Sequence, residues 1–229
     1  MPALINDHLG GKVYKVYNVF VICLMILVGA VFIYTPGDLI VINLLKQESV
    51  VGNPVVWIVY GGIFAYYLAA TLFPIDKIIG KVYPIFGIIL LLSAVGIFVG
   101  LFVNGYHLEN LSMSNWMGSH PGGVPLLPVF FVTVACGIVS GFHSTQATLI
   151  GRSVSSEREG RKTFYDMMIL EGFIAMIWAA AAMGIYNKGI APELVGKPAV
   201  IGLVANDMLG TVGGLIAIIG VIVLPITSG

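Results

Sequence analysis

The sequence contains few charged residues. Only 10% of its 229 residues are charged, against about 25% in an ordinary soluble domain. Hydrophobic residues make up 58% of the chain, and the mean hydropathy is +0.99. A soluble protein needs a polar shell over much of its surface, which eleven acidic and eleven basic residues cannot supply. We therefore expect the outer surface to face the hydrocarbon of a lipid bilayer.

An excess of basic residues is also absent. The formal net charge is zero, which argues against nucleic acid as a partner, because phosphate binding needs a basic surface. The two cysteines, Cys23 and Cys136, lie within apolar runs and are predicted to be buried and unpaired. Phosphate-binding loops, dinucleotide fingerprints and paired-histidine metal motifs are missing. We expect no metal and no cofactor.

A catalytic serine is not expected either. The segment Gly137-Ile138-Val139-Ser140-Gly141 is superficially similar to the serine loop of an intramembrane protease. It has one residue too many between Gly137 and Ser140, and no histidine on a separate helix could act as the base. The sequence therefore predicts no catalytic residues and no enzyme activity.

Long apolar runs dominate the chain. A helix needs about 20 apolar residues to cross a hydrocarbon core of about 30 Å. Six runs approach this length, although the fourth and fifth carry polar interruptions and the sixth is short and rich in glycine. The runs are Val16–Ile42, Val55–Phe73, Val82–Val103, Val124–Ile150, Phe164–Tyr186 and Met208–Leu224. The sequence thus predicts an all-α, polytopic bundle of about six transmembrane helices, forming one transmembrane domain over residues 1–229.

The basic residues between these runs alternate in number from loop to loop. Eight of the basic residues are predicted to lie on one side of the membrane, and three on the other side. The eight are Lys12, Lys15, Lys77, Lys81, Arg152, Arg158, Arg161 and Lys162, and the three are Lys46, Lys188 and Lys197. Lysine and arginine favour the cytoplasmic side. Both termini are therefore predicted to be cytoplasmic.

Polar side chains cluster at the end of the fourth run. They are Ser140, His143, Ser144, Thr145 and Gln146. One interpretation is that the hydroxyls bond back to their own helix and the small residues simply pack. The other is a substrate- or ion-facing stretch with a local break in the helix, as transporters use at their binding sites. On the second interpretation these five residues bind substrate.

An acidic residue lies deep in the fifth run. Glu171 is about four residues from the middle of that run. A charged group at the centre of a bilayer costs about 2.5–3.5 kcal/mol on insertion scales, so it should face the protein interior or water. Glu171 could carry a proton, or it could make a structural hydrogen bond to a neighbouring helix. His143 is the natural candidate partner.

Other polar residues have simpler interpretations. Asp38, Asp166 and Asp207 lie near predicted helix ends, where ion pairing or helix capping accounts for them. Ser156 and Glu159 have the spacing of a capping box at the start of a helix. The basic hairpin around them is either a solvated loop that sets the topology or a cytoplasmic gate.

Two segments resemble the signature of the carbon starvation protein A family. They are Gly141-Phe142-His143-Ser144-Thr145-Gln146-Ala147-Thr148-Leu149-Ile150-Gly151-Arg152 and Glu171-Gly172-Phe173-Ile174-Ala175-Met176-Ile177-Trp178-Ala179-Ala180-Ala181-Ala182. Both are long, unusual and in the expected order. A weaker resemblance extends from about Pro2 to Gly229.

The resemblance implies a multi-pass transporter of the bacterial inner membrane that works by alternating access. Its substrates would be peptides or small carboxylates such as pyruvate, taken up when preferred carbon is scarce, and protons would be coupled to uptake. Family members are longer than this chain, so the resemblance also implies an internal fragment of a larger transporter. A truncated, non-transporting membrane module or assembly subunit is the alternative.

Overall fold

Helices make up most of the part of the chain that the structure describes. The computed structural model covers residues 2–73, 76–108, 110, 112, 125–140, 147–190 and 197–228. All regular elements in these ranges are helical, which confirms the predicted all-α class. The chain divides into two compact units. One comprises Met1–Val28 and Glu109–Glu171, and the other comprises Gly29–Leu108 and Gly172–Gly229.

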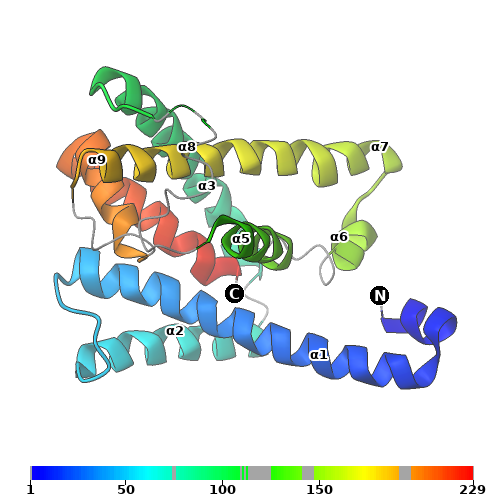
Figure 1. Ribbon diagram of the computed structural model, residues 1–229. Coiled ribbons are helices and arrows are strands. Elements are labelled where there is room, and N and C mark those ends of the chain that lie inside the picture. The colour runs from blue at the N-terminus through cyan, green and yellow to red at the C-terminus, as the bar shows by residue number, and fades with distance from the viewer. Residues whose placement is uncertain are drawn as a thin grey trace. The chain divides into compact units, whose positions relative to one another are not determined.

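The first unit begins with the early part of helix α1 (Figure 1). The whole of α1 runs from Pro2 to Leu39, and it kinks at Gly10, where φ is 80°. Glycine suits this position because it alone enters that region without steric cost. The other elements of the unit are α5 (Leu126–Ser140), α6 (Ala147–Ser153), α7 (Glu157–Gly160), the π-helix η2 (Arg161–Asp166) and the start of α8 (Met167–Asn187).

The second unit contains the end of α1 and the remaining helices. These are the π-helix η1 (Ile40–Leu44), α2 (Pro54–Leu72), α3 (Asp76–Val103), most of α8, and α9 (Ala199–Ser228). The start of α2 follows from its sequence. The Asn53 side chain accepts a hydrogen bond of 3.0 Å from the Val55 N–H, and Pro54 occupies a first-turn position that needs no N–H donor.

Five helices among the described residues are long and apolar enough to cross a membrane. They are Ile5–Leu44, Pro54–Leu72, Pro84–Val103, Glu157–Asn187 and Ala199–Thr227. They correspond to five of the six predicted runs. The remaining run, Val124–Ile150, contains α5 with 15 residues and the first part of α6, whereas residues 141–146 lie outside the described part. The cytoplasmic location of both termini stays a prediction.

Large apolar side chains lie on the outside of these helices. In the second unit, Leu72 is 77% exposed and Phe102 is 69% exposed. Exposed apolar side chains are energetically favourable against lipid tails, so they agree with the surface that the composition predicts. Cys23 and Cys136 are free, which confirms that they are unpaired, but both are exposed, so the prediction that they are buried was wrong.

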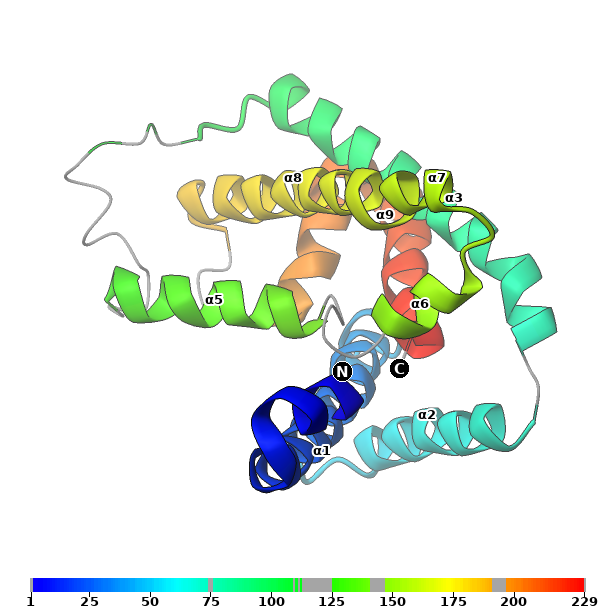
Figure 2. The same cartoon turned by 90° about the vertical axis from the view of Figure 1, so that its right-hand side faces the viewer.

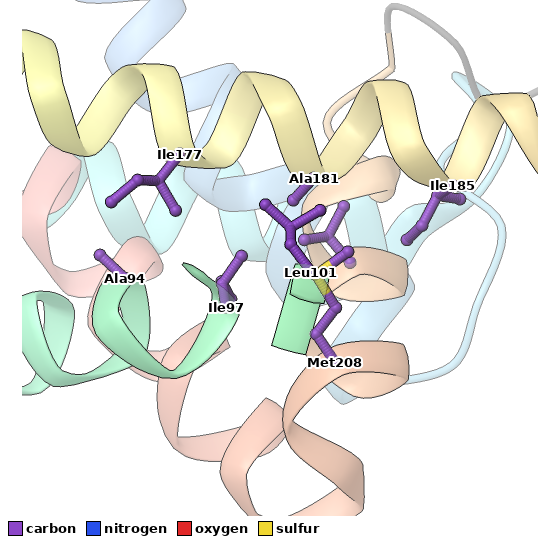
Figure 3. Packing of buried hydrophobic residues seen from close by; sticks show 8 residues of the cluster. Ala94, Ile97, Leu101, Ile177, Ala181, Ile185 and Met208 are labelled. Atoms are coloured by element: carbon purple, nitrogen blue, oxygen red, sulfur yellow. The ribbon is translucent and has the colours of Figure 1, made fainter. Parts of the chain in front are cut away.

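Helices α3, α8 and α9 form the main core of the second unit. Figure 3 shows their side chains meeting, with Ile97 from α3, Ala181 from α8 and Met208 from α9 among them. Small residues bring α3 and α9 close together. A Cβ on Gly96 would lie 2.6 Å from Leu209, and one on Gly100 would lie 3.2 Å from the Met208 carbonyl oxygen. Glycines four residues apart commonly allow this close approach in membranes.

Helix α9 is broken in the middle. Gly210 has φ 71° and ψ 178°, so the segment consists of two helical parts that meet at an angle (orange to red in Figures 1 and 2). The parts fold against each other, because a Cβ on Gly214 would lie 2.9 Å from the Asn206 Cα. Leu39 of α1 is fully buried between them, in contact with the cluster that includes Ala205 and Ala217. We call this arrangement the α9 elbow.

Candidate functional site

Most of the predicted substrate-binding residues lie outside the described part of the chain. This applies to His143, Ser144, Thr145 and Gln146. Ser140 is the last residue of α5, and its side chain is not described. Their role as a substrate-facing stretch therefore stays a prediction.

Glu171 is the one predicted site residue whose side chain is described. It lies in the first turns of α8 and is exposed on the surface of the chain. Its predicted partnership with His143 stays a prediction, because His143 is outside the described residues. The proton-coupling role of Glu171 likewise stays a prediction.

The structure brings together a different group of polar residues, centred on Asp38. This residue lies near the end of α1, between Pro36 in the same helix and the π-helix η1. It is only 4% exposed. Asp38 is four residues before the end of the first apolar run at Ile42, which places it about 6 Å inside that end at 1.5 Å per residue. The second unit therefore buries an acid inside a candidate membrane span.

Hydroxyl groups surround the Asp38 carboxylate. The Tyr60 hydroxyl of α2 donates a hydrogen bond of 2.6 Å to Oδ1, and the Ser49 hydroxyl donates to the same oxygen. Tyr34, one turn earlier on α1, packs its ring edge to face against the ring of Tyr60. We call these four residues the Asp38 cage.

Aromatic packing holds the cage in place. The Tyr60 ring meets the rings of Tyr34 and Trp57 edge to face, with centroid separations of 6.3 Å and 6.4 Å. A Cβ on Gly37 would lie 2.5 Å from the Tyr60 ring, so the absence of a side chain there lets the ring lie directly against α1. The Trp57 indole N–H in turn donates a hydrogen bond of 2.9 Å to the Val51 carbonyl.

The Asp38 cage corrects one prediction. Ion pairing or capping was expected to account for Asp38, but its observed partners are hydroxyls. The same expectation is confirmed for Asp166, whose Oδ1 lies 3.6 Å from Arg161 Nε. That is the one ion pair among the described residues, and both side chains are well exposed, so it contributes little to stability.

The predicted capping box is also wrong. Ser156 is the N-cap of α7, but its side chain makes no capping hydrogen bond. Glu159 instead accepts a hydrogen bond of 2.7 Å from the hydroxyl of Ser155. The side-chain partner of Glu159 is thus Ser155, and Ser156 contributes only its backbone carbonyl, which accepts a hydrogen bond of 3.1 Å from the Glu159 N–H.

A second polar link ties α1 to α2 and α9. Pro36 has no N–H, so it cannot donate to the Phe32 carbonyl as a helical residue normally would. The Tyr67 hydroxyl of α2 lies 3.0 Å from that carbonyl oxygen and 3.4 Å from the Pro225 carbonyl oxygen of α9. The proline in α1 is thereby accommodated by a side chain from a neighbouring helix, as is usual in membrane proteins.

These residues have a chemistry in common. A hydroxyl both donates and accepts hydrogen bonds, whereas an ammonium or guanidinium group only donates. Hydroxyl partners can therefore stabilise a carboxylate and can also turn to accept from a carboxylic acid. No group of three or more potential metal-binding acids, histidines or cysteines occurs among the described residues. The cage thus pairs a buried acid with neutral hydroxyl groups.

The fold and this site define a class: a multi-pass helical membrane protein with an acid buried in one of its apolar helices. The sequence profile of the carbon starvation protein CstA family matches residues 9–225. The chain belongs to that family.

Its relatives include two kinds of named transporter. A protein of Haemophilus influenzae, described as an uncharacterized membrane protein, is 34% identical over 82% of this chain and 62% of its own length. The pyruvate/proton symporter BtsT of Escherichia coli is 30% identical over 50% of this chain and 16% of its own length. The peptide transporter CstA of Helicobacter pylori is 32% identical over 31% of this chain and 11% of its own length. This chain thus spans less than two thirds of each, and no solved structure matches it.

Proposed function

We propose that this chain is part of a proton-coupled secondary transporter of the bacterial inner membrane. Its substrates would be small carboxylates such as pyruvate, or short peptides. Family membership and the names of the two kinds of transporter among its relatives support this proposal. The observation that carries the proton-coupled mechanism is the buried Asp38, held by hydroxyls within a candidate membrane span.

The energetics of a buried acid support a proton at Asp38. An ionised carboxylate in hydrocarbon costs about 2.5–3.5 kcal/mol on insertion scales even at a helix centre. Two hydroxyl partners offset part of this cost, because hydrogen bonds to charged groups contribute about 1.5–3 kcal/mol. On this proposal, Asp38 takes up and releases the coupled proton as the site opens to each side of the membrane.

The α9 elbow supports a moving site. The break at Gly210 leaves helix-terminal N–H and C=O groups in the middle of an apolar segment. Transporters use such broken helices to bind substrates and ions near the middle of the membrane. Leu39 directly follows Asp38 and packs inside the elbow. A movement of the backbone at the cage would therefore be transmitted to α9.

We assign the polar stretch at the end of the fourth run to the substrate path. Its residues are Ser140, His143, Ser144, Thr145 and Gln146. Glu171 is a second acid for proton transfer. Both assignments rest on the sequence, and the residue types match the hydrogen-bonding groups of a carboxylate or peptide substrate.

An uptake assay tests the function directly. The chain would be reconstituted into liposomes, and accumulation of labelled pyruvate and of labelled dialanine would be followed with and without an inward proton gradient. We expect saturable uptake of one of them, raised by the gradient. Uptake equal to that of protein-free liposomes would contradict transport and favour a non-transporting membrane module. Ion conductance that does not saturate with substrate would point to a channel.

A substitution tests the role of Glu171. Glu171→Gln removes the titrating group and keeps the size, so gradient-driven uptake should fall while the amount of protein in the membrane stays the same. Glu157→Gln on α7 is the matched control, because Glu157 is also exposed and lies outside the apolar part of the helix. If both variants show wild-type uptake kinetics, Glu171 has no part in the mechanism.

A further inference from the structure

An unusual polar group lies in the π-helix that follows the Asp38 cage. Asn43 is the fourth residue of η1, whose register is shown by the hydrogen bond of 2.9 Å from the Leu45 N–H to the Ile40 carbonyl. Short π-helical turns are rare, and many of those that are found lie at functional sites. Here the turn presents the Asn43 side chain to α9, because a Cβ on Gly202 would overlap its amide.

The Nδ2 group of the Asn43 amide has no hydrogen-bond partner among the described residues. Nδ2 is buried, and no described residue accepts a hydrogen bond from it. Nearly all buried side-chain polar groups in proteins are hydrogen-bonded, so an exception has a cause. A leucine would fill the same space without a donor to satisfy, which suggests that the amide has a use other than packing.

The packing against Gly202 also orients the amide. The structure has Oδ1 toward Gly202, closer than Nδ2 to the position that a Cβ there would take. This leaves the N–H₂ group as the free end. An amide N–H₂ group binds acceptor oxygens, such as those of a carboxylate or a carbonyl. Gly202 thus leaves room for the Asn43 amide beside the first part of α9.

We propose that Asn43 is a substrate-binding residue, whose Nδ2 donates a hydrogen bond to a carboxylate or carbonyl oxygen of the transported molecule. The choice of ligand rests on the proposed transport function. The observation itself, a buried donor held between η1 and α9, does not depend on that function. The position is distinct in sequence from the polar stretch of the fourth run.

Binding and stability of Asn43→Leu test the inference. The full chain in detergent micelles would be melted with increasing concentrations of pyruvate or of dialanine, since a ligand that binds the folded state raises the melting temperature. We expect a rise for the wild type with at least one of the two. Asn43→Leu should melt at or above the wild-type temperature without ligand, and should bind about tenfold more weakly, as loss of one hydrogen bond implies.

Asn187→Leu is the matched control. Asn187 is exposed at the end of α8 and donates a hydrogen bond of 3.3 Å to the His107 carbonyl, so its replacement should leave the ligand-induced rise unchanged. Three results would each overturn the inference: a lower melting temperature or failure to fold for Asn43→Leu without ligand, unchanged affinity in that variant, or no rise with either compound in the wild type. Binding that depends on Asn43 without any uptake in liposomes would refute the transport function alone.

Discussion

Replacing Asp38 by asparagine should abolish proton-driven uptake and leave the fold intact. Asparagine has the size of the protonated acid, and its oxygen can still accept hydrogen bonds from Tyr60 and Ser49. It cannot release a proton. Accumulation of pyruvate or dialanine in response to a proton gradient should therefore fall to the level of protein-free liposomes. The measurement is uptake by reconstituted Asp38→Asn chains at matched protein density.

Substrate exchange separates coupling from folding in this variant. With the same substrate on both sides of the membrane and no proton gradient, Asp38→Asn should still exchange labelled for unlabelled molecules, because exchange needs an intact site and no net proton movement. Glu48→Gln is the control, since Glu48 is an exposed acid close in sequence to the cage, and it should keep gradient-driven uptake. Wild-type accumulation by Asp38→Asn would show that the cage is only structural.

The helices were predictable where apolar residues run without interruption. The second run, Val55–Phe73, agrees with α2 (Pro54–Leu72) to within one residue at each end. The sixth run, Met208–Leu224, was placed too late, because α9 begins at Ala199. The polar pair Asn206 and Asp207 interrupts the hydropathy there, although a helix accommodates both.

The Asp38 cage was not predictable from local patterns. Ser49 and Tyr60 are 11 and 22 residues away from Asp38, and no periodicity links positions so far apart. One signal was available: an acid inside an apolar run is by default a functional candidate. By that rule Glu171, in the middle of a run, is predicted as a functional acid, whereas Asp38, near the end of a run, is predicted only to pair or cap. Depth in the membrane was a poor guide to burial within the protein.

The glycine content of the sixth run is a sequence signal for the α9 elbow, but it does not identify the break. The sixth run was noted as rich in glycine, and Gly210, Gly213 and Gly214 lie within it. Composition alone does not distinguish a break from close helix packing, since both need glycine. The structure separates these roles: Gly210 has a positive φ, whereas Gly214 lies against Asn206.

Gly214→Ala should strongly destabilise the second unit. The added Cβ would lie 2.9 Å from Cα and 3.0 Å from the backbone nitrogen of Asn206. Backbone atoms cannot rotate away as a flexible side chain would, so the elbow must open. Overpacking of this kind costs about 1–3 kcal/mol. The apparent melting temperature of the chain in detergent, followed by near-UV circular dichroism, should fall accordingly.

Gly61→Ala is the matched control for that change. Gly61 lies in the interior of α2, and a Cβ there meets no atom within 4 Å. Alanine favours a helix by about 1 kcal/mol over glycine, so this variant should be as stable as the wild type or more so. Equal stability of Gly214→Ala and the wild type would contradict the close contact with Asn206.

Combining Gly214→Ala with Leu39→Ala tests whether Leu39, the residue that follows Asp38, is energetically coupled to the α9 elbow. Leu39 is fully buried between the two parts of α9, and it directly follows Asp38. An elbow already opened by Gly214→Ala has lost part of its contact with Leu39. The double variant should therefore lose less stability than the sum of the two single variants, because the substitutions act on one shared contact. Strict additivity would mean that Leu39 and Gly214 do not act on a shared contact, and it would contradict the proposed role of Leu39 as a link between Asp38 and α9.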